Sequence, residues 1–215
     1  MSTEIELKYQ ISSNSETKDT VADDITAMLE ENNVLFEMNQ NQLINNYFDS
    51  ESLALRKMDF GLRIRIKGQQ YEQTIKTAGT VVGCLHQRPE FNINIPTNQL
   101  NLSLFDQTIW PENTDIVSLE KDLRVIFSTN FLRQTWLIHQ NESVIELALD
   151  RGVISTGSGK PTLDINELEI ELVSCNEQAL FVLAEQLMAI VEMEPGKLSK
   201  AARGYALYYD QCNRG

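Results

Sequence analysis

Apolar and charged residues alternate along several stretches of the chain, beginning at its N-terminus. In residues 4–9, two acids and a lysine alternate with Ile5, Leu7 and Tyr9. Neighbouring side chains of an extended strand point to opposite faces, so the charged residues share one face and the apolar residues share the other. Similar patterns predict further strands at residues 43–48, 62–67, 71–77, 86–95, 131–140, 144–150 and 165–173.

Apolar residues at helical spacing predict a smaller number of helices. They lie at about residues 16–33, at 116–126, and from a cap at Asn176 to about residue 190, before Pro195 and Gly196. A last helical stretch is expected to carry Lys200 and Arg203 on one side. Residues 53–58, 78–83 and 96–115 are expected to be irregular. Because no stretch of the sequence reads as a linker, the pattern predicts one α+β domain over residues 1–215.

The composition excludes several classes of protein. The 215 residues include 18 basic and 31 acidic side chains, for a net charge of −13, which argues against a nucleic-acid or anionic-membrane partner. No apolar run approaches the length of a membrane span, and the N-terminus lacks the pattern of a secretory signal. Cys84, Cys175 and Cys212 fit neither a disulfide framework nor a zinc spacing. A cytoplasmic protein is therefore expected.

Charged residues are sorted by sign along the predicted strands. Bases gather on some strands and acids on others: Arg63, Arg65, Lys67, Lys76 and Arg88 against Glu4, Glu6, Glu167, Glu169 and Glu171. Three glutamates on one strand face repel one another and need nearby cations. An open sheet could leave them in water. A closed antiparallel β-barrel of about eight strands would instead supply the cations, with charged faces lining a tunnel and helices packed on the apolar outside.

A tunnel lined by both signs of charge suits a polyphosphate ligand. Arginine and lysine bind phosphate oxygens, arginine often through two parallel hydrogen bonds. Carboxylates hold hard divalent cations such as Mg²⁺ or Mn²⁺ through oxygen. Phosphoryl transfer depends mostly on positioning and on charge neutralisation. The pattern therefore favours metal-assisted chemistry on a chain of phosphates.

Residues 4–8, Glu-Ile-Glu-Leu-Lys, resemble the ExExK signature of the CYTH superfamily, the triphosphate tunnel metalloenzymes. The resemblance continues through residues 61–65, 74–76, 86–90, 146–150, 167–171 and 198–205, and so covers nearly the whole chain. Residues 83–91 and 198–205 are most similar to the CYTH domain of bacterial inorganic triphosphatases. In that branch a helical CHAD domain commonly follows. The chain stops at Gly215, so we expect a single CYTH domain, either without a CHAD domain or taken from a longer protein.

The resemblance implies a divalent-metal-dependent enzyme that hydrolyses inorganic triphosphate to diphosphate and phosphate. It implies metal ligation by Glu4, Glu6, Glu169 and Glu171, with Asp150 and Glu167 as further candidates. It implies triphosphate binding by Lys8, Arg63, Arg65, Lys76, Arg88, Arg133, Lys200 and Arg203. The nucleophile would be a water near Lys8, which would act with a tyrosine, and Tyr47 is the candidate. Glu146 would be a ligand or would orient a base.

Two alternative functions remain open at this point. A class IV adenylate cyclase or thiamine triphosphatase would use the same scaffold and select the organic group at the tunnel mouth. A non-catalytic module would bind polyphosphate or nucleotides without turnover. Individual residues also have structural alternatives. Arg63 and Arg65 could serve only as ion-pair partners of glutamates, and Tyr47 could be only a packing residue. Glu90 is expected to orient Arg88.

Overall fold

The computed structural model describes residues 2–12, 20–140 and 142–213. Within these residues, ten strands form one sheet: β1 (Ser2–Ile11), β2 (Leu35–Asp49), β3 (Gly61–Lys67), β4 (Gln70–Lys76), β5 (Thr80–Val82), β6 (Leu85–Ile95), β7 (Arg124–Gln140), β8 (Ser143–Ser155), β9 (Thr162–Ser174) and β10 (Met193–Pro195). The same residues contain the helices α1 (Val21–Glu31), α2 (Ala54–Lys57), α3 (Ile116–Asp122), α4 (Gln178–Met188) and α5 (Lys200–Cys212), with 3₁₀ turns at Leu102–Leu104 and Gln107–Ile109.

Eight of the strands close into an antiparallel barrel, which confirms the predicted architecture. The hydrogen-bonded order is β1-β9-β8-β7-β2-β3-β4-β6, and β6 pairs with β1 to complete the circle. The short strands β10 and β5 add to β1 and β6. Closure leaves the eight barrel strands without a free edge and gives the sheet an interior.

The strand register brings the charged faces together on the inside. On one side of β1, Glu6 lies opposite Glu171 of β9. On the other side of β1, Glu4 lies opposite Arg88 of β6. Residues directly opposite each other in adjacent strands project from the same face. The alternation in these strands therefore places their charged residues inside the barrel and their apolar residues outside.

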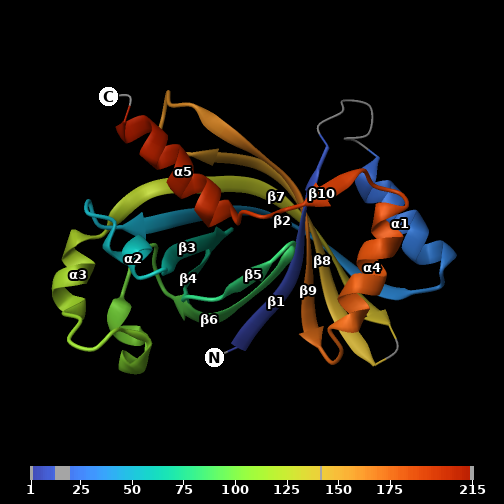
Figure 1. Ribbon diagram of the computed structural model, residues 1–215, viewed down its shortest axis with the longest axis horizontal. Coiled ribbons are helices and arrows are strands. Elements are labelled where there is room, and N and C mark those ends of the chain that lie inside the picture. The colour runs from blue at the N-terminus through green and yellow to red at the C-terminus, as the bar shows by residue number, and fades with distance from the viewer. Residues whose placement is uncertain (1, 13–19, 141, 214–215) are drawn as a thin grey trace.

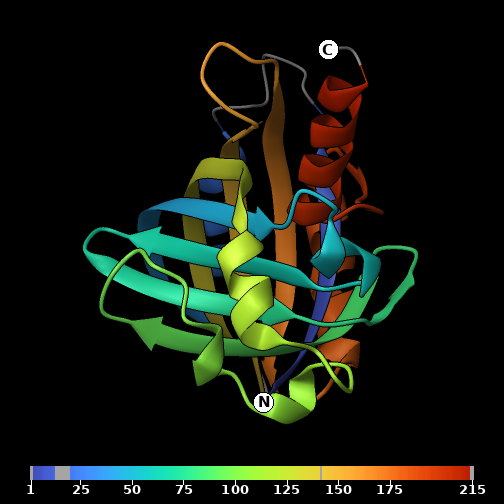
Figure 2. The ribbon, with the colours of Figure 1, turned by 90° about the vertical axis from the view of Figure 1, so that its left-hand side faces the viewer.

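Helices cover the apolar outside of the barrel in two places. Helices α1 and α4 pack on β1, β7, β8 and β9, and helices α2 and α3 pack with the 3₁₀ turns near β3 and β4. Helix α5 packs instead on inward-facing apolar residues, such as Phe131 of β7, which shares a strand face with Arg133, and Ile165 of β9, which shares one with Glu167. Figure 1 shows α1 and α4 together on one side of the molecule, with α5 and α3 on the other. Figure 2 shows α3 in front of the strands of the barrel. In the part of the chain that is described, no helix is long and apolar enough to cross a membrane.

Helix α5 is anchored to the barrel by a buried polar contact. Tyr205 donates its hydroxyl proton to Asp49 Oδ2 at 2.8 Å, and Asp49 is fully buried at the end of β2. The same carboxylate accepts three backbone N–H groups in or just before α2. Gly204 lies so close to the ring of Phe127 that a β-carbon would not fit. These contacts hold the first turn of α5, which carries Lys200, over the barrel.

The predicted strand at residues 43–48 is too short. Strand β2 begins at Leu35 and pairs with β7 along its whole length. Residues 39–42 are asparagine and glutamine, which are rare in strands, so the sequence pattern missed them. Within this half of the strand, Asn39 lies opposite Thr135 and Asn41 lies opposite Arg133. Long-range pairing with β7 therefore outweighs the local preference.

Several other predicted boundaries also change. The helix predicted at 116–126 ends at Asp122, because residues 124–126 already belong to β7. The segment 78–83 contains β5, and the segment 53–58 contains α2. The first helix is observed as Val21–Glu31, and residues 13–19 of its predicted start lie outside the described residues.

We expect Tyr205→Phe to lower the free energy of unfolding by about 1.5–3 kcal/mol, because it removes a hydrogen bond to a buried carboxylate. The loss can be measured by urea denaturation. Tyr209→Phe is the matched control, since Tyr209 is 44% exposed on the same helix. Equal stability of the Tyr205 variant and the wild type would contradict the anchoring role.

Candidate active site

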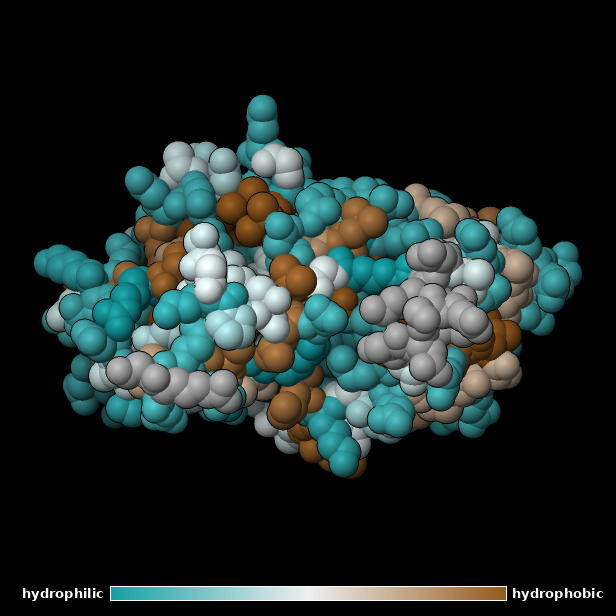
Figure 3. All heavy atoms as spheres, turned by 90° about the horizontal axis from the view of Figure 1, so that it is seen from above, coloured by the Kyte–Doolittle hydropathy of each residue, from teal (hydrophilic) through white to brown (hydrophobic). Residues whose placement is uncertain are grey.

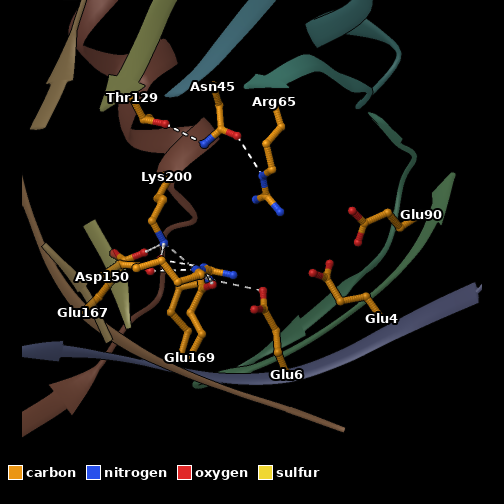
Figure 4. A network of polar contacts seen from close by, with 12 residues as sticks. Glu4, Glu6, Asn45, Arg65, Glu90, Thr129, Asp150, Glu167, Glu169 and Lys200 are labelled. Carbon is orange, nitrogen blue, oxygen red and sulfur yellow. Dashed lines mark hydrogen bonds and ion pairs between the residues drawn. The ribbon is translucent and has the colours of Figure 1, made fainter. Parts of the chain in front are cut away.

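A cavity of about 260 Å³ lies inside the barrel. All the predicted site residues line it except Asp150, Glu167 and Arg203. Its described lining contains seven glutamates and seven lysines or arginines: Glu4, Glu6, Glu72, Glu90, Glu146, Glu169, Glu171, Lys8, Arg63, Arg65, Lys76, Arg88, Arg133 and Lys200. Figure 4 shows side chains from opposite walls pointing toward an open centre. The barrel therefore brings together residues that are far apart in the sequence.

Lys200 neutralises the tightest group of acids. Asp150, Glu167 and Glu169 place carboxylate oxygens within 4.8 Å of one another. The Lys200 amine lies 2.6 Å from Asp150 Oδ2 and 2.9 Å from Glu169 Oε1, and it also contacts Glu167 (Figure 4). Arg133 binds both oxygens of Asp150, at 2.7 and 2.6 Å. Burial would raise the pKa of Asp150, but these cations hold it below its usual value. Cations of the protein itself therefore balance the negative charge of this group. Metal ligation by Asp150 and Glu167 stays a prediction.

Arg203 lies behind this group rather than on the cavity wall. Its Nη1 lies 3.0 Å from Glu167 Oε2, and its Nη2 donates to the carbonyl of Asp164. Gln10 donates to the same Glu167 oxygen at 2.7 Å. These contacts tie α5 to β9 and β1. The predicted contact of Arg203 with triphosphate stays a prediction.

Three glutamates on β1 and β9 are less completely compensated. Burial and the neighbouring Glu4 and Glu6 raise the pKa of Glu171 to about 8. Burial also raises the pKa of Glu6, although Lys8 lies 3.2 Å away. Glu4 contacts Lys76 at 2.5 Å. Crowded carboxylate oxygens are the donors that Mg²⁺ and Mn²⁺ prefer, so this wall fits a divalent cation.

Lys8 is a permanent cation in the cavity. Its amine contacts Glu169 and lies 3.2 Å from Glu6. Burial opposes the charged form, but these acids hold the pKa of Lys8 well above its usual value. Lys8 can therefore donate hydrogen bonds and stabilise negative charge, but it cannot act as a base at neutral pH.

Tyr47 lies on the cavity wall, held from two sides. Its ring stacks on Phe127 with centroids 4.5 Å apart. Its hydroxyl lies close enough to Arg63 to influence the pKa of that arginine. Burial would lower the pKa of Arg63, but Tyr47 and Glu90 raise it above its usual value. Tyr47 and Lys8 line the same cavity, and their joint action on a water stays a prediction.

Two of the described cations on the cavity wall, Arg65 and Arg88, have no carboxylate within 4.0 Å. Arg65 Nε donates to Asn45 Oδ1 at 3.0 Å, and the fully buried Asn45 donates to Thr129 Oγ1 at 2.8 Å (Figure 4). Burial and two neighbouring arginines lower the pKa of Arg65 to about 10, so it remains charged at neutral pH. An anion would relieve this excess of positive charge. No sequence pattern pointed to Asn45, which lies in an asparagine-rich strand.

The expectation that Glu90 orients Arg88 is wrong. Glu90 instead lies 3.2 Å from the Lys76 amine and 3.4 Å from Arg63 Nη2. Burial would raise the pKa of Glu90, but these cations lower it to about 2. Glu90 therefore positions two bases on β3 and β4, a role that depends on strand pairing and not on sequence proximity.

A second hollow of about 360 Å³ continues from the first. The two hollows share Arg65, Glu72, Arg133 and Glu146 in their linings. The two hollows therefore adjoin each other inside the barrel, where charged residues line both.

A family model of the CYTH domain matches residues 2–205. The chain belongs to the CYTH family. An inorganic triphosphatase from Haemophilus influenzae is 39% identical over 168 residues, which cover 76% of this chain and 45% of that protein. The chain thus spans about half the length of the curated relative it matches.

Solved structures share this CYTH fold at low sequence identity. A proposed adenylyl cyclase from Hippeastrum, which has a dominant triphosphatase activity, is 15% identical with a TM-score of 0.64, covering 97% of this chain and 96% of its own. A proposed adenylate cyclase from Bacillus halodurans is 20% identical with a TM-score of 0.52, covering 94% and 98%. The Mimivirus capping enzyme triphosphatase is 12% identical with a TM-score of 0.53, covering 87% and 89%. These likenesses establish the fold.

We expect Glu171→Gln to stabilise the metal-free CYTH domain at high pH. The pKa of Glu171 rises from 4.5 to about 8 on folding, so the folded state binds the extra proton. Stability is therefore lost as the pH rises from about 4.5 to 8. Urea denaturation in EDTA should show a gain on the order of 2 kcal/mol at pH 9 and little gain at pH 4.

The exposed Glu185 provides the matched control, Glu185→Gln, which should change stability at neither pH. A gain for Glu171→Gln that did not depend on pH would show that the crowding of acids is not its cause.

Proposed function

We propose that this CYTH domain hydrolyses inorganic triphosphate to diphosphate and phosphate inside the tunnel, with Mg²⁺ or Mn²⁺. The observation that carries the proposal is a single cavity with two complementary deficits. The acids of β1 and β9 lack enough cations, whereas Arg65 on β3 and Arg88 on β6 lack carboxylate partners. A metal–triphosphate complex would supply both. The 39% identity to an inorganic triphosphatase supports this choice of substrate.

The charge balance supports the need for a metal. The cavity lining holds equal numbers of acidic and basic residues, whereas the whole chain has a net charge of −13. The acidic surplus therefore belongs to the rest of the molecule. Figure 3 shows hydrophilic residues over much of its upper face, with hydrophobic patches between them. A triphosphate would bring several further negative charges into the balanced cavity. A bound divalent cation would offset them, polarise a phosphoryl oxygen and lower the pKa of a bound water.

Glu4, Glu6 and Glu171 would hold the cation, with Glu169 as a further ligand. Their oxygen donors suit Mg²⁺ and Mn²⁺, and their crowding disfavours the metal-free state. Asp150 and Glu167 are better explained as partners of Lys200, which occupies the space between them. This assignment separates the acids that bind metal from those that hold α5.

The bases would hold the phosphate chain from several sides. Arg65 and Arg88 are free to bind phosphate oxygens without breaking an ion pair. Lys8, Arg63, Lys76, Arg133 and Lys200 would contribute from positions fixed by their carboxylate partners. Such preorganised charges lower the cost of rearrangement during phosphoryl transfer. Lys8, as a cation, would donate a hydrogen bond near the attacking water, and Tyr47 would orient that water.

We also propose that residues 1–215 act as one CYTH domain in the cytoplasm. The three cysteines are free thiols, which suits a reducing compartment. The curated relative is about twice as long as the matched region. If the chain comes from a longer parent protein, we expect the additional length to hold a CHAD domain.

A phosphate-release assay tests the function directly. Triphosphate, ATP and thiamine triphosphate would be compared with Mg²⁺ and with Mn²⁺, and cyclic AMP would be measured with ATP. We expect metal-dependent turnover to be fastest with triphosphate. Cyclic AMP formation would favour a cyclase, which the two proposed cyclases of the same fold make a specific alternative. Tight binding without turnover would favour a binding module.

Glu6→Gln should lower kcat for triphosphate by at least about 100-fold, because it removes a charged metal ligand. The thermal unfolding midpoint should not fall, since Glu6 is a source of repulsion in the metal-free cavity. Glu112→Gln, on the exposed surface, should leave kcat unchanged. Normal metal-dependent turnover by the Glu6 variant would refute the ligand assignment.

Arg65→Ala should raise KM for triphosphate by about 10- to 100-fold, because a charge-assisted contact of about 1.5–3 kcal/mol is lost. The KM of Arg65→Lys should lie between those of Arg65→Ala and the wild type, since lysine keeps the charge but not the planar fork of arginine. Lys160→Ala on the exposed surface serves as the control. A KM unaffected by either Arg65 substitution would exclude Arg65 from the phosphate site.

A further inference from the structure

Two arginines of the cavity, Arg65 and Arg133, are held by partners of different charge. Arg133 donates to both oxygens of the Asp150 carboxylate, at 2.7 and 2.6 Å. Arg65 Nε donates instead to a neutral amide, Asn45 Oδ1, at 3.0 Å. Asp150 therefore both positions Arg133 and balances its charge, whereas Asn45 positions Arg65 and leaves its charge unbalanced.

Asn45 is fixed by the strands on both sides of it. In the strand register it lies opposite Thr129 of β7 and opposite Arg65 of β3. Asn45 Nδ2 donates to Thr129 Oγ1 at 2.8 Å, and both of these side chains are fully buried. Because the nitrogens of arginine can only donate, the amide oxygen faces Arg65 and the amide nitrogen faces Thr129. The amide thus has one orientation, which holds the guanidinium in place.

The rest of the Arg65 guanidinium points into the open centre of the cavity (Figure 4). Among the described residues, none accepts a hydrogen bond from its two terminal nitrogens. Glu72 lies opposite Arg65 in the register of β3 and β4, but its carboxylate forms no ion pair with it. An arginine that is held at Nε and free at both terminal nitrogens can bind an anion such as phosphate through those nitrogens.

A carboxylate in the place of the Asn45 amide would change the charge of this row with little change in its shape. Aspartate is nearly the size of asparagine, and it can accept from both Arg65 and Thr129, since a hydroxyl group can donate as well as accept. Burial, followed by the neighbouring Arg63 and Arg133, lowers the pKa of Arg65 to about 10. An anion at position 45 would offset the repulsion among these arginines. A phosphate would then compete with an anion that belongs to the protein.

We propose that Asn45 is a positioning residue that orients Arg65 toward a phosphate oxygen and, being neutral, leaves the charge of Arg65 available to the substrate. This inference rests on the proposed function, because the phosphate is that of the triphosphate in the same cavity. The amide leaves the empty cavity with more uncompensated positive charge than a carboxylate would, and it keeps the affinity for an anion higher.

Asn45→Asp separates orientation from charge, because it keeps the acceptor oxygen and adds a negative charge. Binding is measured by calorimetry in Mg²⁺ with diimidotriphosphate, whose bridging nitrogens resist hydrolysis, and KM and kcat are measured with triphosphate. The dissociation constant and KM should rise by about tenfold, as expected for the loss of one charge-assisted contact. The value of kcat should stay close to that of the wild type, since the contact is made equally in the ground state and the transition state.

Stability distinguishes this role from a merely structural one. The thermal unfolding midpoint of Asn45→Asp in EDTA should not fall, because the new carboxylate offsets the repulsion among the arginines. Asn98→Asp makes the same chemical change on the exposed surface and should alter neither affinity nor stability. Wild-type affinity in Asn45→Asp would overturn the inference. So would a joint fall of affinity and unfolding midpoint, because that result would indicate damage to the fold.

A double-mutant cycle keeps the inference testable if Asn45→Asp does not fold. Asn45→Ala removes the acceptor without adding a charge, and it should raise the dissociation constant by about threefold. In the Arg65→Ala background the same substitution should have no effect, since no guanidinium is left to orient. An equal effect of Asn45→Ala in both backgrounds would overturn the inference.

The two proposals can fail separately. If triphosphate is not hydrolysed but Asn45→Asp weakens the binding of diimidotriphosphate as expected, only the proposed activity is refuted. If triphosphate is hydrolysed but Asn45→Asp binds diimidotriphosphate as tightly as the wild type, only the positioning role of Asn45 is refuted.

Discussion

Compensation of enclosed charge is the constraint on which this structure depends. A buried ion is tolerated only where partners offset its loss of hydration. Lys200 meets this need for Asp150, Glu167 and Glu169 together, from the first turn of α5. Helix α5 therefore contributes both a charge and apolar packing to the interior of the barrel. Its anchor, the Tyr205 hydroxyl on buried Asp49, connects this packing to the charges of the tunnel.

The places where compensation is incomplete indicate the site. Around Lys200 every acid has a cationic partner, so no bound ligand is needed to balance the charge there. On β1 and β9 the acids outnumber their partners, and the pKa of Glu171 rises to about 8. Near β3 the bases outnumber theirs, and the pKa of Arg65 falls to about 10. One cavity thus lacks positive charge at one place and negative charge at another. It suits a ligand that carries both charges, as a metal–polyphosphate complex does.

The barrel could be predicted from the sequence because alternation is a local property of each strand. Residues 4–9 and 62–67 reveal their two faces without any knowledge of their neighbours. The pairing of individual charges could not be predicted, since it depends on register between distant strands. Glu90 illustrates this, because its partners Lys76 and Arg63 lie on β4 and β3 and not beside it in sequence. Asn45 was missed for a related reason, because its role exists only once Thr129 and Arg65 flank it.

The net charge of −13 and an anionic ligand are compatible because the barrel separates two electrostatic environments. Exposed charges are screened by salt over about 8 Å at physiological ionic strength. Enclosed charges act on one another across a poorly screened cavity, as Arg63 and Arg133 act on Arg65 and as Glu4 and Glu6 act on Glu171. The lining is balanced although the chain is not, so the overall charge describes encounters at the surface and says little about affinity inside. Net charge is therefore informative about partners that bind the outside, and the local balance of the lining must be used for ligands that enter the tunnel.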